Sequence, residues 1–306
     1  MSKLLSYLVD EGDLPRGIPL VAGLTGFMDS GSAVSQFTEY LTDTLDSTIV
    51  AIFDADELLD YRARRPTMYF DQDHFTGYES PRLAIHLVRD DVDQQFYFLT
   101  GFEPDFRWEK FSQSLIEFVD LFEVSMTTWV HAIPMPAPHT RPLGVTVSGN
   151  RRDLVEAMSV WRPHTQVPGN AMHLVEYHLQ STGHPVAGFV VLVPHYLADS
   201  EYPSAALVSL QSITAATGLI FPTDRLRDEA REFDSNIDGQ VRENDELGSL
   251  VSKLEATYDE YMKEQNLRSP FMNSDGDLPT ADRIAAELED FLAMQRRRDS
   301  GSADSL

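Results

Sequence analysis

The chain has 306 residues, of which 42% are hydrophobic and 24% are charged, a composition typical of a globular protein that can bury a core of its own. It contains no cysteine, which excludes disulfides, thiolate nucleophiles and cysteine-ligated metal centres. Its net charge of −25 disfavours nucleic acids and anionic membranes as partners, because both would be repelled.

No segment has the pattern of a targeting or membrane-spanning sequence. Residues 1–14 carry acidic side chains and lack the basic start and the cleavage site of a signal peptide. The longest apolar run, Val186–Val193, has eight residues, whereas a helix needs about 20 to cross a bilayer. Together with the absence of cysteine, these features predict a cytoplasmic protein.

Charged residues are unevenly distributed along the chain. Residues 1–222 hold 41 of them, and the much shorter stretch 223–306 holds 32. We therefore predict two parts, an α/β core domain over 1–222 and an acidic helical extension with a flexible tail over 223–306.

Strand and helix signals alternate in the first part. Residues 20–26 and 47–54 are short apolar runs bounded by turns, and such runs predict strands. Between them, Val34, Phe37 and Leu41 recur at the spacing of one helical face.

Two further strands are predicted at 81–88 and 95–100, and the short polar link between them indicates an antiparallel pair. The remaining signals predict helices at 108–122, 171–179 and 205–216, and strands at 126–133, 144–147 and 186–193. This alternation predicts an α/β fold with a mixed, mainly parallel sheet that is covered by helices on both faces.

The second part has helical signals of its own. Five apolar side chains fall at heptad-like spacing and predict a helix suited to packing against a partner helix: Leu247, Leu250, Leu254, Tyr258 and Tyr261. Residues 266–278 are rich in turn residues and predict a loop, after which Thr280 is expected to cap a last helix.

Four polar segments each follow a predicted strand, at 23–32, 101–108, 134–142 and 194–197. In open α/β sheets, ligands bind beyond the carboxyl ends of the parallel strands. If the four strands are mutually parallel, their exits meet at one edge and form a candidate ligand crevice. This convergence is the main functional signal in the sequence.

The first exit is glycine-rich and contains Gly26, Asp29, Ser30 and Gly31. Glycines allow a tight turn into a helix whose first amides can hold an anion. The lysine of a nucleotide P-loop is missing, and Asp29 would repel phosphate. The alternative is a structural turn in which Asp29 or Ser30 caps the helix.

The second exit carries Glu103 and Asp105 on either side of a proline. Glu103 is a candidate for acid–base chemistry or for holding a hydroxyl group. The alternative is a charged helix start whose aromatic residues anchor it to the core.

The third and fourth exits both contain a Pro-His pair. The third has four prolines within 134–142, and its stiffness would hold His139 and Arg141 toward an anionic or carbonyl ligand. The fourth adds His195 and Tyr196. Structural roles are the alternatives, with Arg141 paired to an acid of the chain and the histidine of the fourth exit serving the fold.

Signatures of well-defined chemistries are missing from the sequence. It has no G-x-S-x-G elbow, no H-E-x-x-H, no G-x-G-x-x-G after a strand and no EF-hand loop. His139, His195 and Glu103 lack the spacing of metal ligands, so we expect neither a metal nor a cofactor. No catalytic residue can be assigned, and the sequence favours a protein without enzymatic activity.

Five motifs occur in order over about residues 18–220: Gly26-Phe27-x-Asp29-x-Gly31, Asp60-Tyr61-Arg62 with Pro66, Gly101-x-Glu103-Pro104-Asp105, Pro138-His139-Thr140-Arg141-Pro142 and Val193-Pro194-His195-Tyr196. Together they resemble the bacterial branch of the proteasome assembly chaperone family. The resemblance implies a three-layer αβα sandwich of the phosphorylase/hydrolase-like architecture, homo-oligomers with a trimer among the expected sizes, and no established reaction. Eukaryotic relatives hold proteasome α subunits during ring assembly.

Two functions are consistent with these observations. The first, which we prefer, is a non-enzymatic protein-interaction or assembly-chaperone-like role with a protein partner, and it rests on the resemblance and the heptad helix. The second is a protein that binds a nucleoside-like or anionic small molecule in the crevice, or a hydrolase- or phosphorylase-like enzyme that uses it.

Overall fold

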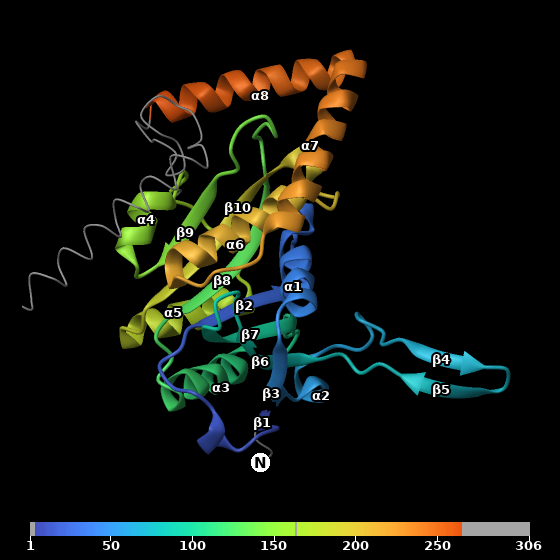
Figure 1. Ribbon diagram of the computed structural model, residues 1–306, viewed down its shortest axis with the longest axis vertical. Coiled ribbons are helices and arrows are strands. Elements are labelled where there is room, and N and C mark those ends of the chain that lie inside the picture. The colour runs from blue at the N-terminus through green and yellow to red at the C-terminus, as the bar shows by residue number, and fades with distance from the viewer. Residues whose placement is uncertain (1–3, 163, 265–306) are drawn as a thin grey trace, which may run out of the picture. The chain divides into compact units, whose positions relative to one another are not determined.

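The computed structural model describes residues 4–162 and 164–264. Its main element is an eight-stranded sheet with the strand order β1-β3-β6-β7-β2-β8-β10-β9 (Figure 1). The strands are β1 (Leu5–Tyr7), β2 (Leu20–Thr25), β3 (Ser47–Phe53), β6 (Leu83–Arg89), β7 (Gln95–Phe102), β8 (Thr127–Met135), β9 (Val145–Gly149) and β10 (Val186–Pro194). A separate hairpin consists of β4 (Met68–Asp71) and β5 (His74–Tyr78).

Four neighbouring strands, β7, β2, β8 and β10, are mutually parallel. Antiparallel pairs flank this parallel block, with β6, β3 and β1 following β7 on one side and β9 following β10 on the other. The predicted α/β fold with a mixed sheet is therefore confirmed. The predicted antiparallel pair corresponds to β6 and β7.

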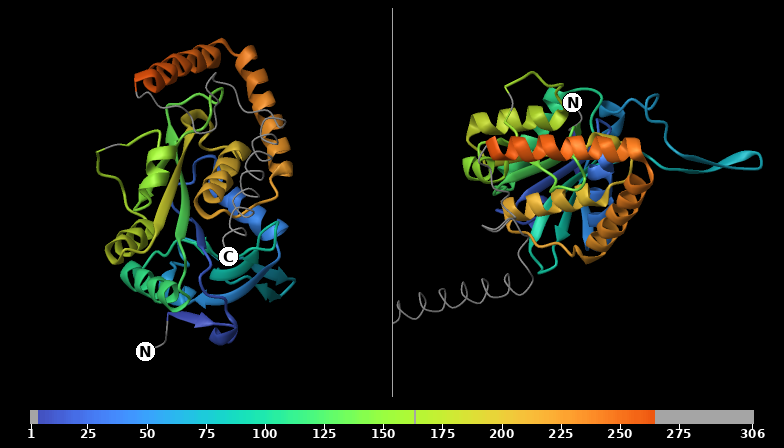
Figure 2. Two further views of the ribbon diagram at one scale, coloured as in Figure 1. Left: turned by 60° about the vertical axis from the view of Figure 1, so that its left-hand side comes forward. Right: turned by 90° about the horizontal axis from the view of Figure 1, so that it is seen from above.

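Helices cover both faces of the sheet (Figures 1 and 2). On one face, α1 (Ala33–Thr44) and α6 (Pro203–Thr217) contribute to one buried apolar cluster. On the opposite face, α3 (Trp108–Leu121) and α5 (Ala171–Thr182) contribute to a second. Successive strand residues point to opposite faces, so Val130 and Ala132 belong to the first cluster and Trp129 to the second.

The sequence analysis missed several elements that bury little apolar surface. These are β1, β4, β5, α2 (Ala55–Leu58) and α4 (Arg152–Met158). Every side chain of β4 is exposed, so the hairpin has no alternation of buried and exposed residues that a sequence pattern could reveal.

The chain continues after the core into two long helices, α7 (Asp224–Glu243) and α8 (Asp245–Glu264). α7 packs against α6, and the predicted heptad helix corresponds to α8. Within the described part of the chain, residues 4–162 and 164–261 belong to one compact unit. A domain boundary at residue 222 stays a prediction, and the predicted loop 266–278 and the helix after Thr280 lie outside the described residues. Among the described residues, no helix is long and apolar enough to span a membrane.

Gly188 in β10 lies against the indole ring of Trp129. A methyl group added at Gly188 would lie 2.4 Å from Trp129 Cε2, and the ring is held in place because its Nε1 donates to Glu176 at 2.7 Å. We therefore expect Gly188→Ala to lower the free energy of unfolding by ~1–3 kcal/mol, the usual cost of overpacking a core. Urea unfolding followed by circular dichroism measures this change.

Gly169→Ala is the matched control, because a methyl group at Gly169 meets no atom within 4 Å. Its unfolding midpoint should equal that of the wild type. Equal stability of the two variants would contradict the tight packing of β10 against Trp129.

Candidate functional site

The carboxyl ends of β7, β2, β8 and β10 lie side by side at one edge of the sheet, because these strands are parallel neighbours. Neighbouring strands end at the same level, since Thr25, the last residue of β2, pairs with Phe102 of β7, and Pro194, the last residue of β10, pairs with Met135 of β8. All four exits therefore leave from the same edge. What they can bind depends on the contacts that their side chains already make.

Asp29 of the first exit caps the first turn of α1. Its Oδ1 accepts the Val34 N–H at 2.8 Å, and its Oδ2 accepts the N–H of Ser35 at 2.9 Å and the hydroxyl of Ser35 at 2.8 Å. Three hydrogen bonds thus connect the carboxylate to its own helix. This geometry matches the structural alternative for the first exit.

The rest of the first exit packs against the fourth. Gly31 has a φ of 70°, which favours glycine, and a Cβ there would lie 3.2 Å from side-chain atoms of both Val193 and Tyr202. Its N–H donates to the Ala198 carbonyl at 2.7 Å. Ser30 beside it is buried. The two segments therefore support each other at the edge.

Asp105 and Gly26 meet at Arg64, which lies in the segment that leads into the β4–β5 hairpin. Arg64 forms an ion pair with Asp105, and its guanidinium carbon lies 5.2 Å from the centroid of the Phe102 ring. Asp105 also accepts the Asp60 N–H at 2.8 Å. A Cβ at Gly26 would lie 2.8 Å from Arg64 Nη2. The first and second exits therefore both contact Arg64, at the base of the hairpin.

Glu103 of the second exit contacts the N-terminus of α5. Its Oε1 accepts the Ala171 N–H at 2.6 Å, and the residue is only 8% exposed. Burial raises the pKa of the Glu103 carboxyl above its ordinary value, although the Ala171 N–H and the Arg64 guanidinium act in the opposite direction. A carboxyl group with a raised pKa is suited to hydrogen bonding and to acid–base chemistry.

His139 and Tyr196 join the third and fourth exits. The Tyr196 hydroxyl accepts the His139 backbone N–H at 2.7 Å and lies 2.7 Å from His139 Nδ1. His139 Nε2 lies 3.2 Å from Asp238 Oδ1. Because a carboxylate can only accept, Nε2–H is the donor in this contact, and in the neutral imidazole Nδ1 then accepts the proton of the Tyr196 hydroxyl. Because Asp238 belongs to α7, this contact fastens α7 to the core.

Arg141 fastens α8 in a similar way. Its Nε and Nη2 donate to the two carboxylate oxygens of Asp259 at 2.9 and 2.8 Å, and its Nη1 donates to Glu255 at 3.2 Å. The Tyr258 hydroxyl donates to the Pro142 carbonyl at 3.1 Å. We call the contacts of residues 138–142 with α7 and α8 the clasp. They match the structural alternative for the third exit.

Two groups of predicted site residues remain. His195 is exposed, and its ring meets that of Tyr196 edge to face, with 5.5 Å between centroids. On α8, Leu254 is buried and Leu247 and Leu250 are half-buried. The Tyr261 hydroxyl donates to the Val160 carbonyl at 3.1 Å. The apolar side of α8 is thus largely used within the chain, and its role in binding a partner stays a prediction.

The sequence analysis overlooked His131, which lies in β8 at the same edge. Burial lowers the pKa of its imidazole from 6.5 to about 4, and nearby His173 adds to the effect. The ring stacks on Phe27, with 5.3 Å between centroids. His131 stands inside an apolar strand, TTWVHAIPM, without a motif around it, so no sequence signal distinguished it from a core residue.

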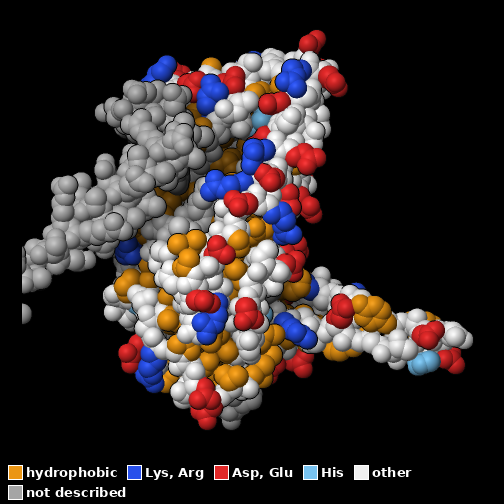
Figure 3. All heavy atoms as spheres, in the orientation of Figure 1, with side chains coloured by type: hydrophobic (Ala, Val, Ile, Leu, Met, Phe, Trp, Pro, Cys, Tyr) orange, Lys and Arg blue, Asp and Glu red, His pale blue; other side chains and the backbone are white. Residues whose placement is uncertain are grey.

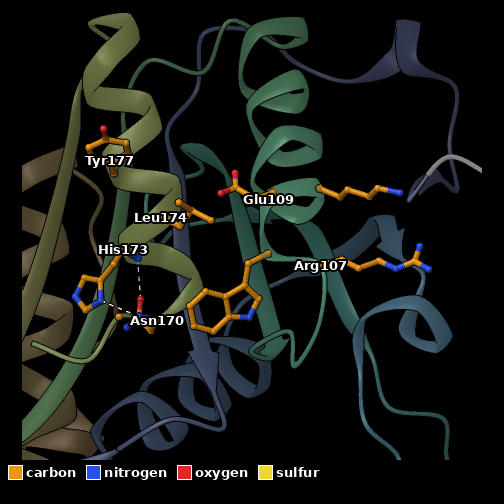
Figure 4. Close-up of a pocket in the computed structure, with 9 residues that line it drawn as sticks. Arg107, Glu109, Asn170, His173, Leu174 and Tyr177 are labelled. Atoms are coloured by element: carbon orange, nitrogen blue, oxygen red, sulfur yellow. Dashed lines mark hydrogen bonds between the residues drawn. The ribbon is translucent and has the colours of Figure 1, made fainter.

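A groove of about 640 Å³ lies between α3 and α5 (Figure 4). Trp108, Leu174 and Tyr177 are among the side chains that line it. Arg107 points away from the groove and pairs with Glu57 on α2 (Figure 4). Within the part of the chain that the structure describes, no cluster of three or more histidines and carboxylates could hold a metal ion.

The sequence profile of the PAC2 family matches residues 23–241. A Mycobacterium tuberculosis protein of unknown function is 37% identical, with a TM-score of 0.79, and the match covers 87% of this chain and 92% of that one. A Corynebacterium glutamicum protein of unknown function is 34% identical, with a TM-score of 0.79, and the match covers 85% of this chain and 99% of that one. A Mycobacterium tuberculosis proteasome-assembly chaperone homologue is 22% identical, with a TM-score of 0.69. That match covers 76% of this chain and 100% of the homologue, and it shows a shared fold. Among curated proteins, no sequence matches the chain.

The clasp makes the attachment of α8 depend on Arg141. Arg141→Met keeps most of the side-chain bulk and removes two ion pairs whose groups are between 30% and 43% exposed. Pairs this exposed contribute ~0.2–1 kcal/mol each, so loss of both should make amide hydrogen exchange in α8 roughly twofold to thirtyfold faster. Exchange in β2 and β8, measured by mass spectrometry in the same experiment, should not change.

Arg16→Met is the control, because it removes an exposed ion pair with Glu123 that is remote in sequence from α7 and α8. It should leave exchange in α8 at the wild-type rate. An unchanged rate in Arg141→Met would show that the clasp does not hold α8.

His131 gives the protein a defined pH dependence. Because its pKa is lowered on folding, its contribution to stability is complete above pH 6.5 and is lost as the pH falls toward 4. His131→Phe keeps the ring and removes the titration. Between about pH 7 and 4.5, its free energy of unfolding should therefore fall by ~2–3 kcal/mol less than that of the wild type. Urea unfolding at each pH measures the difference.

Comparison with this variant isolates His131 from other groups. Glu103, whose raised pKa contributes with the opposite sign, is present in both proteins. If the free energy of unfolding of the two proteins fell equally between pH 7 and 4.5, the His131 imidazole would be solvated.

Proposed function

Because the chain belongs to the PAC2 family, we propose that it is a non-enzymatic, assembly-chaperone-like protein that forms homo-oligomers and binds another protein. One structural relative is a proteasome-assembly chaperone homologue, and it supports this role by analogy of fold. The proposal includes no reaction. The cytoplasmic location expected from the sequence stays a prediction.

The observation that carries this proposal is the β4–β5 hairpin, which projects from the body of the sheet (Figures 1 and 3). Its large hydrophobic side chains are exposed to solvent: Met68 (46%), Tyr69 (50%), Phe70 (61%), Phe75 (63%) and Tyr78 (53%). Phe70 and Phe75 pack against each other across the strands, with 5.1 Å between ring centroids. A group of large hydrophobic side chains exposed in this way is typical of a protein interface.

The hairpin needs a partner for a second reason. An isolated two-stranded hairpin is marginally stable in water, and this one makes no strand pairing with the eight-stranded sheet. Burial of its aromatic side chains would supply the missing stabilisation, since the free energy gained is about 25 cal/mol for each Å² of apolar surface.

A second copy of the chain is the partner that the surface fits best. Each copy also exposes large hydrophobic side chains at the sheet edge: Met28 (47%) after β2, Phe102 (38%) at the end of β7 and Phe106 (50%) after β7. Contact between the hairpin of one copy and the edge of the next joins two different surfaces. Repeated contacts of this type close into a ring if the rotation between copies permits it, and a trimer is one such ring.

The mass of the protein in solution tests the homo-oligomer. The wild-type chain should run as a multiple of its 34.5 kDa monomer in size-exclusion chromatography with light scattering. Phe70→Ser combined with Phe75→Ser should give a folded monomer, because serine removes the apolar surface without burying a charge. Val167→Ser, at a position that is 64% exposed outside the hairpin, should keep the wild-type mass.

The assembly role has its own test. Affinity purification from lysate with the wild type and the Val167→Ser control should retain a protein partner other than the chain itself. The hairpin double variant should lose that partner, because in this proposal the partner binds the assembled oligomer. A monomeric wild type would overturn the oligomer. Retention of nothing except the chain itself would overturn the assembly role, whatever the oligomeric state.

A further inference from the structure

The β4–β5 hairpin is joined to the core by two connecting segments, and both contact the second strand exit, residues 101–108. In the segment before β4, Arg64 forms an ion pair with Asp105. In the segment after β5, the carbonyl of Arg82 lies so close to Gly101 that a Cβ there would be 2.2 Å from its oxygen. One short stretch of the core therefore carries both ends of the hairpin.

Arg64 makes three contacts at this stretch. It pairs with Asp105, and the two side chains are only 19% and 22% exposed. Its guanidinium carbon lies 5.2 Å from the centroid of the Phe102 ring, a distance at which a cation and an aromatic ring attract each other. Its Nη2 lies beside Gly26, where a Cβ would be 2.8 Å away. A planar guanidinium can satisfy an ion pair and a ring contact together only in a narrow range of orientations.

Little freedom remains between Arg64 and the hairpin. Only Arg65, Pro66 and Thr67 separate Arg64 from the first residue of β4, and the proline ring fixes one of the backbone angles in this link. The Glu79 N–H donates to the Thr67 carbonyl at 3.0 Å and closes the base of the hairpin. The hairpin pairs with no strand of the eight-stranded sheet, so its direction depends on these connections.

We propose that Arg64 is the positioning residue of the hairpin, and that its contacts with Asp105 and Phe102 hold the hairpin in one direction relative to the core. This role rests on the proposed function, because it assumes that the hairpin joins copies of the chain. A surface that is already held in its bound direction loses less conformational freedom on binding. Arg64 thus strengthens the contact between copies without belonging to the exposed aromatic surface.

The second strand exit also carries Phe102 and Phe106, two of the exposed side chains that receive the hairpin of the next copy in the proposed oligomer. The surface that docks and the surface that receives are therefore built on the same stretch, and Arg64 sets the angle between them. A ring closes only if the rotation from one copy to the next permits it. A fixed angle therefore favours one closed assembly over a mixture.

Distances between spin labels test the direction of the hairpin. The chain has no cysteine, so labels can be attached after Thr76→Cys in β5 and Gln113→Cys on α3, two exposed positions. Met28→Ser with Phe106→Ser keeps the hairpin intact and changes the surface that receives it, and excess unlabelled chain restricts the signal to distances within one chain. Double electron–electron resonance should give one narrow distribution, and Arg64→Met should make it roughly twice as wide or wider, because the hairpin loses its constraint.

Arg65→Met is the matched control, because Arg65 is the next residue, is exposed and forms no ion pair within the described residues. It should leave the width of the distribution unchanged. Asp105→Asn keeps an acceptor for the Asp60 N–H and removes only the charge that Arg64 binds. It should widen the distribution as Arg64→Met does.

The dissociation constant of the homo-oligomer is the second readout. In the otherwise wild-type chain, Arg64→Met should raise this constant about tenfold, because a free hairpin must be ordered on binding. Arg65→Met should leave the constant unchanged. Sedimentation velocity over a dilution series measures it, and circular dichroism checks that each variant is folded.

Equal widths with and without Arg64, or a broad distribution while Arg64 is present, would overturn the inference. An unchanged dissociation constant in Arg64→Met would overturn it as well. A wild-type chain that is monomeric at every concentration would overturn the homo-oligomer instead, and the distance measurement would still decide whether Arg64 sets the direction of the hairpin.

Discussion

The shared direction of β7, β2, β8 and β10 is the constraint on which the rest of the structure depends. Parallel neighbours end at the same edge, so the polar loops that follow them must satisfy their hydrogen-bonding groups against one another or against whatever covers that edge. Asp29 turns back onto α1, and Glu103 crosses to the N-terminus of α5. His139 reaches α7. The contacts of the site follow from this crowding of polar groups.

The acidic excess of the chain decides how the cations at this edge are used. With 49 acidic and 24 basic residues, carboxylates outnumber cationic side chains about two to one. Arg141 forms ion pairs with Asp259 and Glu255 of α8, and Arg64 forms one with Asp105. The anionic ligand that the sequence suggested for the Pro-rich loop is therefore not needed to satisfy Arg141. The carboxylates of Glu255 and Asp259 occupy the position beside Arg141 and thereby attach α8 to the core.

The sequence predicts the elements in which one face is buried, because burial of one face makes apolar residues recur at a regular spacing. Val34, Phe37 and Leu41 lie on the buried face of α1 because one side of that helix must leave water. The hairpin could not be found in this way, because its aromatic side chains stay exposed in the monomer. The convergence of the four exits was predictable because it follows from strand direction. Their partners were not, since His139 and Asp238 are 99 residues apart and Arg141 and Asp259 are 118 apart.

The hairpin and the second strand exit are physically connected through Arg64. This residue belongs to the segment that enters the hairpin, yet it pairs with Asp105, lies over Phe102 and influences the charge of Glu103. A change in the direction of the hairpin on assembly would therefore act on the same segment that carries Glu103. Arg64 is therefore the residue through which a contact made at the hairpin would reach the polar edge of the sheet.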